Sequence, residues 1–194
     1  IQKGCFMGEY KFDTLKKYLD DLAAKVVAPG GGSAAALTAS CGSSLISMVV
    51  NFTLGKPKYA PFEQDLRKIL AESEELRLKF LDLVDLDVTA YKSKNMRDAL
   101  DIPFMVCRLC FEAMKLCPPL IRKGNVNLVS DVSVAAILLE AAFSSAYCNV
   151  EINLKSLNDK ALTRSVLKEL TGKLKSMRKT RLDMEEKVGK IIRG

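Results

Sequence analysis

A chain of 194 residues is long enough to bury the core of one ordinary domain. Hydrophobic residues make up 48% of it and charged residues 27%, a balance that excludes a disordered, low-complexity protein. The net charge of +7 leaves polyanionic partners open, and the absence of histidine excludes imidazole as the proton carrier.

The first residues contribute little to the prediction of the fold. The chain begins with Ile1, and Met7 follows, so we expect residues 1–10 to be an N-terminal extension or an expression remnant. They do not have the charged and then apolar segments of a secretory signal. We expect residues 11–194 to form a single helical domain.

Six cysteines in apolar, helix-like surroundings are too few for a disulfide scaffold of this length and favour a reducing cytoplasm. Cys107 and Cys110 form a CxxC, but no second CxxC and no histidine accompany it. We interpret these two as small buried hydrophobic residues and predict no metal site.

The first predicted helix covers residues 11–25, where Leu15, Leu19, Leu22 and Ala23 recur every three or four positions after a capping Asp13 or Thr14. Residues 33–55 then contain no charge, which raises the question of a membrane span. Eight Ser, Thr and Asn residues make the segment too polar for a lone span, and we see no second comparable one. We expect a buried helix whose small residues let another backbone approach.

A long helix is predicted over residues 62–96, which lack glycine and proline. Pro103 should bound a shorter helix over 104–117 that stops or kinks at Pro118 and Pro119, with a loop over 122–127. Ser130 or Asp131 should cap a second small-residue-rich helix reaching residue 154, and heptad-like spacing predicts a last helix, interrupted by Arg181. No alternating strand is recognisable, so the predicted fold class is all-α, a bundle of about six helices.

Nearly all of the net charge of +7 lies in residues 159–194, where eleven Lys and Arg against five Asp and Glu give a net charge of +6. Clustered cations suit nucleic acid, but acids are interleaved and aromatic residues are absent from this segment. A solvated helix face is the simpler interpretation, and nucleic acid is an unlikely partner. A nucleic-acid-binding module using Lys173, Lys175, Arg178, Lys179 and Arg181 stays as an alternative.

The sequence APGGGSAAALTAS at residues 28–40 places three glycines directly before a helix. Exposed backbone N–H groups at such a helix start can meet an anion or the polar edge of a ligand. The motif is neither a P-loop nor a dinucleotide fingerprint, and by itself it is also compatible with a flexible start of the helix.

Five segments in this order resemble the cyclodeaminase/cyclohydrolase family of folate enzymes, to which the C-terminal domain of formiminotransferase-cyclodeaminase belongs. They are PGGGSAAAL, GKPKY at 55–59, DLDVTAY at 85–91, GNVNLVSD at 124–131 and NVEINL at 149–154. The resemblance covers roughly residues 10–160. It implies an all-helical homodimer that acts on the one-carbon group of a tetrahydrofolate derivative, with no further cofactor.

The implied reaction is formation of 5,10-methenyltetrahydrofolate and ammonia from 5-formiminotetrahydrofolate, the cyclodeaminase reaction, which the sequence slightly favours. The alternative is hydrolysis of the methenyl cation to 10-formyltetrahydrofolate, the cyclohydrolase reaction. A non-catalytic dimer descended from such an enzyme is a further alternative. Either reaction needs a proton carrier and a group that tolerates positive charge.

Without histidine, carboxylates, lysine and tyrosine are the candidates for these roles. We expect Asp131 to act as base or counter-charge, Lys56 as acid and Asp87 as second carboxylate; plain N-capping by Asp131 and a solvated Lys56 are the competing accounts. Tyr59 is a candidate for stacking on the pterin. The remaining expected substrate-binding residues are Gly30, Gly31, Gly32, Ser33, Lys58, Tyr91, Asn125, Asn127, Ser130 and Asn149, although loop asparagines are often structural.

Two expectations concern assembly and substrate. The two small-residue-rich helices are so apolar that other helices should pack against nearly every side of them. A second copy of the chain would supply the missing contacts, so we predict an obligate homodimer that does not associate with membranes. The basic last helix lies outside the motif set, and we expect Lys173 and Lys175 to help hold a polyglutamate tail of the folate.

Overall fold

The structure is a computed structural model that describes residues 9–194, and all regular elements in that range are helical. The prediction of an all-α bundle is thereby confirmed. Residues 1–8, most of the predicted N-terminal extension, lie outside the described residues. The α-helices are α1 (Leu15–Ala23), α2 (Gly31–Asn51), α3 (Glu63–Ser93), α4 (Met96–Lys115), α5 (Cys117–Lys123), α6 (Val129–Leu157) and α7 (Lys160–Arg193), with 3-10 turns η1 (Tyr10–Phe12), η2 (Pro57–Phe62) and η3 (Val126–Leu128).

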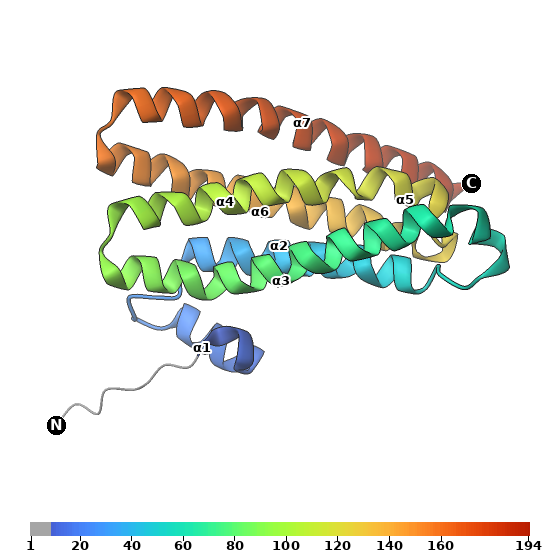
Figure 1. Cartoon of the computed structure of the whole chain (residues 1–194), viewed down its shortest axis with the longest axis horizontal. Coiled ribbons are helices and arrows are strands. Elements are labelled where there is room, and N and C mark those ends of the chain that lie inside the picture. The colour runs from blue at the N-terminus through green and yellow to red at the C-terminus, as the bar shows by residue number, and fades with distance from the viewer. Residues whose placement is uncertain (1–8) are drawn as a thin grey trace.

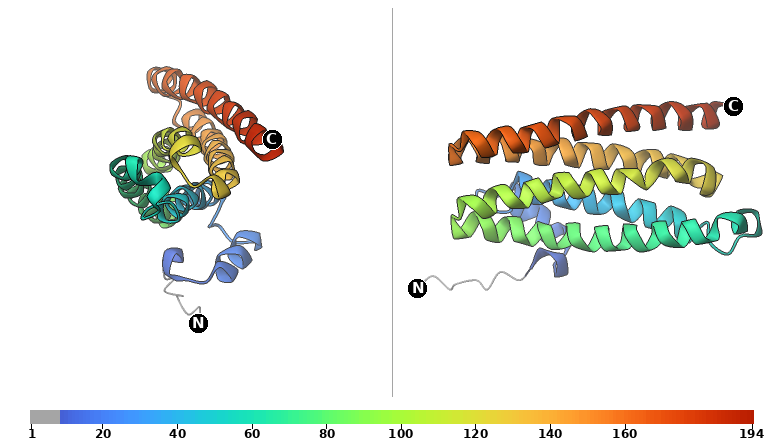
Figure 2. Two further views of the ribbon diagram at one scale, coloured as in Figure 1. Left: turned by 90° about the vertical axis from the view of Figure 1, so that its right-hand side faces the viewer. Right: turned by 45° about the horizontal axis from the view of Figure 1, so that its top comes forward.

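Four long helices form the bundle, in which α2 packs on α3 and α6, and α4 closes the ring by packing on α3 and α6. The chain reverses direction at each connection, and α7 lies along the outside of α6 (Figures 1 and 2). The starts of α2, α4 and α7 therefore share one end of the bundle with the ends of α3 and α6. We call this the α2-start end, and the opposite one, where η2, α5 and η3 lie, the α2-finish end.

Small residues let α2 lie against its neighbours, as the sequence predicts. Ala36 and Ala39 are fully buried, and Ser47 Oγ lies 2.8 Å from Ser73 Oγ of α3. Gly42 faces α6, where an added Cβ would lie 2.9 Å from Leu139 Cγ and 3.3 Å from the Ala135 carbonyl oxygen. The close contact between α2 and α6 therefore depends on glycine, which has no side chain, at position 42.

Gly42→Ala is expected to lower the free energy of unfolding by about 1–2 kcal/mol, because overpacking outweighs the gain in helix propensity. The matched control is Gly172→Ala in α7, where an added Cβ meets no atom within 4 Å. That variant should gain about 0.5–1 kcal/mol. Urea denaturation measures both; a stabilised Gly42→Ala would contradict the close packing.

Two helices have the length and hydropathy of a membrane span, α2 and the segment 126–157 that contains α6. The expectation that no second comparable segment exists is therefore wrong. Burial inside the bundle accounts for much of the apolar character of both, because α2 packs between α3 and α6, and α6 packs against α2, α4 and α7.

Pro103 lies inside α4 and does not bound a helix, which corrects the prediction for residues 104–117. Proline lacks the N–H that would bond the carbonyl four residues earlier, that of Ala99. The side-chain amide of Asn153 on α6 donates to this oxygen at 2.5 Å and replaces the missing bond. Asn95 starts the helix instead, because its Oδ1 accepts from Arg97 N–H at 2.9 Å.

The predicted start of α6 is also wrong, since neither Ser130 nor Asp131 is the cap. The helix begins at Val129 after Leu128, and both residues lie in its first turn. The predicted loop at 122–127 is partly helical, as α5 continues to Lys123.

The last helix forms as predicted, with Leu170, Met177 and Met184 buried. Arg181 interrupts the apolar series because it faces a carboxylate: its Nε lies 3.5 Å from Glu140 Oε2 of α6. The CxxC is structural as interpreted, because Cys107 and Cys110 are fully buried. Burial raises the pKa of both thiols, which keeps them protonated.

Candidate functional site

One of the three glycines, Gly32, lies against a carboxylate at the α2-start end. Gly30 caps α2, and Ser33 N–H donates to Asp87 Oδ2 at 2.8 Å. A Cβ on Gly32 would overlap with Asp87 Oδ1 and lie 2.7 Å from its Cγ. Glycine is therefore required there for the carboxylate of α3 to reach the first turn of α2.

Asp87 is half-buried in this position. Burial raises the pKa of Asp87 above its ordinary value, and the hydrogen bond from Ser33 N–H only partly offsets this. The raised pKa brings the carboxyl group closer to the range in which it exchanges protons near neutral pH.

Gly31, Asn149 and Tyr91, also among the predicted residues, lie at the same end of the bundle. Gly31 faces Asn149 of α6, whose Nδ2 would be 3.5 Å from a Cβ at residue 31 and donates to the Ser145 carbonyl at 3.0 Å. Tyr91 follows Asp87 by one turn of α3 and is 59% exposed. It borders an open hollow of about 500 Å³, which is lined by Val27, Tyr91, Lys92, Lys94 and Met96.

The other predicted residues lie at the α2-finish end, where Tyr59, Asn125 and Asn127 make hydrogen bonds within the protein. Tyr59 is 7% exposed, and its hydroxyl oxygen accepts from Val126 N–H at 3.1 Å. Asn125 is 7% exposed; its N–H donates to Thr53 Oγ1 at 2.9 Å, and its Oδ1 accepts from Asn127 N–H at 3.2 Å. These contacts join η2, the end of α2 and η3.

Charged groups at the α2-finish end remain accessible. Lys56 and Lys58 are exposed, with Lys58 Nζ 5.5 Å from the centre of the Tyr59 ring. Ser130 is exposed, and Asp131 is half-buried in the first turn of α6. Within residues 9–194 the Asp131 carboxylate makes no hydrogen bond or ion pair.

The structure thus divides the predicted set into two groups within one chain. Gly30, Gly31, Gly32, Ser33, Asp87, Tyr91 and Asn149 lie at the α2-start end, and Lys56, Lys58, Tyr59, Asn125, Asn127, Ser130 and Asp131 at the other. The 21 residues of α2 separate the groups by about 30 Å, so a single chain does not bring Asp87 and Asp131 together.

The sequence did not select Tyr18 or Asp85, which both contact the α2-start end. Asp85 lies within the DLDVTAY motif, two residues before Asp87, and holds the N-terminal segment. Tyr18 could have been found as the buried position of the first amphipathic helix.

The basic face of α7 is partly neutralised by carboxylates within the chain. Lys173 Nζ lies 3.3 Å from Glu169 and 4.8 Å from the centre of the Phe111 ring. Arg178 and Arg181 both approach Glu140. Three of the five cations named for nucleic-acid binding therefore have a carboxylate partner, whereas Lys175 and Lys179 are exposed. In the described part of the chain no group of three or more Cys, Asp or Glu residues is arranged to hold a metal.

The architecture and the site define the class of protein, an all-α bundle with a half-buried carboxylate at a glycine-rich helix start. Comparison with known proteins identifies the family. The chain matches the formiminotransferase-cyclodeaminase family over residues 14–95 and 92–172, and it belongs to that family of folate one-carbon enzymes. The resemblance seen in the sequence is confirmed.

Three relatives illustrate the range of the family. The methenyltetrahydrofolate cyclohydrolase of Methylorubrum extorquens is 37% identical over 84% of this chain and 89% of its own length. The formimidoyltransferase-cyclodeaminase of Rattus norvegicus is 27% identical, and the match spans 75% of this chain but 31% of that protein. The crystal structure of formiminotetrahydrofolate cyclodeaminase from Thermotoga maritima has a TM-score of 0.90 and 28% identity, covering 95% of this chain and 100% of that one.

Proposed function

We propose that the protein is a methenyltetrahydrofolate cyclohydrolase in which Asp87 is the general base. The observation that carries the proposal is the half-buried Asp87 carboxylate with a raised pKa at the start of α2. The sequence alone slightly favoured the cyclodeaminase reaction. We place the cyclohydrolase first because the relative of that name is 37% identical to this chain, against 28% for the Thermotoga maritima cyclodeaminase.

The proposed reaction uses Asp87 to remove one proton. A water molecule adds its oxygen to the methenyl carbon between N5 and N10, and Asp87 accepts the proton that this water loses. The tetrahedral intermediate then breaks its bond between carbon and N5, which yields 10-formyltetrahydrofolate. The second proton of the water moves from the hydroxyl of the intermediate to N5 during this cleavage, and Asp87 releases its proton to solvent.

The cyclodeaminase reaction is the second candidate, which the similarity to the Thermotoga maritima structure favours. There N10 attacks the formimino carbon, ammonia leaves after protonation, and the same carboxylate takes the proton of N10. Both reactions pass through a tetrahedral carbon, so one site suits either.

An absorbance assay with the purified protein tests the function and separates the two reactions. We expect 5,10-methenyltetrahydrofolate to be consumed at least 10²-fold faster than in buffer, and 5-formiminotetrahydrofolate to be converted more slowly. The reverse order would make the protein a cyclodeaminase. No conversion of either substrate would favour a non-catalytic dimer, and salt-dependent gel shifts would favour the nucleic-acid module.

A homodimer is the form in which we propose that the site is complete. The outer face of α6 is uncharged and exposed along Ser130, Val134, Ile137, Ala141, Ser145, Cys148 and Ile152. Cys41 of α2 and Phe52, the residue that follows α2, are also exposed. A two-fold axis across this face makes α2 antiparallel to its copy, so the α2-start end of one chain meets the α2-finish end of the other. Asp131 and Lys56 of a second copy would then face Asp87.

The remaining parts of the substrate have candidate positions. Tyr91 offers an exposed ring at the hollow, and Lys92 and Lys94 offer cations for the glutamate carboxylates. Binding of a polyglutamate tail by α7 stays a proposal, with Lys175 exposed and Lys173 already paired with Glu169. We place the protein in the cytoplasm because its described cysteines are all unbridged.

A further inference from the structure

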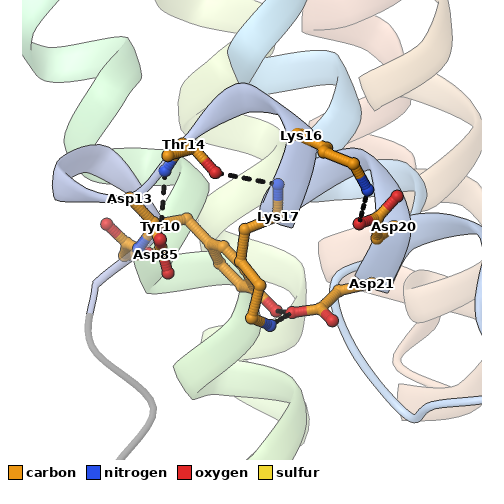
Figure 3. A network of polar contacts seen from close by, with 8 residues as sticks. All are labelled: Tyr10, Asp13, Thr14, Lys16, Lys17, Asp20, Asp21 and Asp85. Carbon is orange, nitrogen blue, oxygen red and sulfur yellow. Dashed lines mark hydrogen bonds and ion pairs between the residues drawn. The ribbon is translucent and has the colours of Figure 1, made fainter.

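The N-terminal segment is fixed to the bundle beside Asp87. The Asp85 carboxylate accepts from Tyr10 N–H at 2.6 Å and from Lys11 N–H at 3.2 Å, so one side chain of α3 holds the start of η1. Figure 3 shows this carboxylate below the turn and the Tyr10 hydroxyl reaching Asp21 of α1, at 2.8 Å. The bonds to Asp85 fix the segment to α3, and the Tyr10–Asp21 bond joins η1 to α1 within the segment.

Tyr18 of α1 connects this segment with the start of α2. Its ring is 3% exposed and packs edge-to-face on Tyr10, with 5.3 Å between the ring centres. Its hydroxyl shares a hydrogen bond of 3.2 Å with Ser33 Oγ. Ser33 is fully buried, and its N–H is the donor to Asp87. One residue thus separates Tyr18 from the carboxylate.

We propose that Tyr18 is a positioning residue for Asp87, acting through Ser33. The hydroxyl of Tyr18 fixes the buried hydroxyl of Ser33, and this holds the first turn of α2 at the distance at which its N–H bonds Asp87. Burial raises the pKa of Tyr18, so the phenol stays neutral at pH 7 and the hydrogen bond persists there. The inference rests on the proposed role of Asp87 as base.

Removing the Tyr18 hydroxyl should raise the pKa of Asp87. The hydrogen bond from Ser33 lowers the pKa of Asp87, against the larger effect of burial. When Ser33 loses its anchor, this bond weakens and the pKa of Asp87 rises further. A base with a higher pKa is active only at higher pH, so the acid limb of the rate profile should move upward.

The experiment compares Tyr18→Phe with Tyr10→Phe in the full chain. For Tyr18→Phe we expect kcat to fall about tenfold with KM within about twofold, and the acid limb of kcat/KM to rise by about half a pH unit. Tyr10→Phe loses the hydrogen bond to Asp21 and keeps the packing of the two rings. The acid limb of its kcat/KM profile and its kcat should therefore match those of the unaltered protein.

Ser33→Ala removes the same hydrogen bond from the other side and covers the case in which Tyr18→Phe folds poorly. The double variant should show no more than the larger single effect, because both changes break one interaction. An unchanged limb in either folded single variant overturns the inference.

A substrate-free measurement separates this inference from the proposed function. NMR titration of the Asp87 carboxyl carbon gives its pKa in each variant without turnover. If the protein lacks activity but Tyr18→Phe still raises that pKa, the proposed function fails and the coupling holds. If Asp87→Asn abolishes activity while Tyr18→Phe leaves the pKa unchanged, only the role of Tyr18 is wrong.

Discussion

Asp87→Asn is expected to lower kcat by about 10²- to 10⁴-fold, the range for loss of a general base. Asparagine keeps the size of the side chain and an oxygen that can accept from Ser33 N–H, so the start of α2 should stay in place. It cannot take a proton from water. Steady-state kinetics with 5,10-methenyltetrahydrofolate measures the loss, and circular dichroism checks the fold.

The matched control is Glu75→Gln, an exposed carboxylate on the same helix that pairs with Lys79. It should keep kcat within about twofold, since exposed ion pairs contribute little. An Asp87→Asn variant with more than about a tenth of the original rate would argue against Asp87 as the base.

The same variant should change how stability depends on pH. The pKa of Asp87 is raised in the folded chain, whereas an unfolded aspartate titrates near about 4. Between these two values the folded state binds more protons, so the contribution of Asp87 to stability is complete below pH ~4 and falls as pH rises through the folded pKa.

Asp87→Asn removes this decline, so the Tm of the variant relative to the unaltered protein should increase from pH 4 to pH 7. Thermal melts at both pH values measure it. A difference that is independent of pH would mean that the carboxyl group is not desolvated by folding.

Mixing two inactive variants is expected to restore activity if the site spans two chains. Asp131→Asn should lower kcat by about 10²-fold or more with its Tm nearly kept, because the two ends of one chain lie about 30 Å apart and Asp131 would serve the second copy. When Asp87→Asn and Asp131→Asn subunits exchange freely, half of the dimers are mixed. Each mixed dimer holds one intact site and one doubly altered site, so about a quarter of the original activity should return.

Two measurements decide whether this recovery has the proposed cause. Light scattering should give the mass of a dimer, and a monomer mass at micromolar concentration would remove the basis of the shared site. Mixing Asp87→Asn with Gly32→Ala is the control, because both changes affect the α2-start end and no mixed dimer then has an intact site. Recovery in this control, or none with Asp131→Asn, would contradict the arrangement.

Sequence alone was sufficient for the helices whose signals are local. The spacing of apolar residues predicted α3 and α7, and an uncharged run of small residues predicted α2. Thr14 was one of the two candidate caps of α1, and its Oγ1 accepts from Lys17 N–H at 3.1 Å. These features depend on residues within one or two turns of each other. The glycine run likewise indicated a close approach at the start of α2.

Contacts between distant residues decided the rest. Pro103 is tolerated inside α4 because Asn153 of α6 donates to the Ala99 carbonyl, which the proline leaves without its helical partner. Sequence patterns within one helix cannot predict a hydrogen bond from another helix. Asp87 became the preferred base over Asp131 because burial and Ser33 N–H act on it across 54 positions of the chain. The separation of the motifs into two ends follows from the antiparallel packing of long helices, which places residues by topology and not by their order in the sequence.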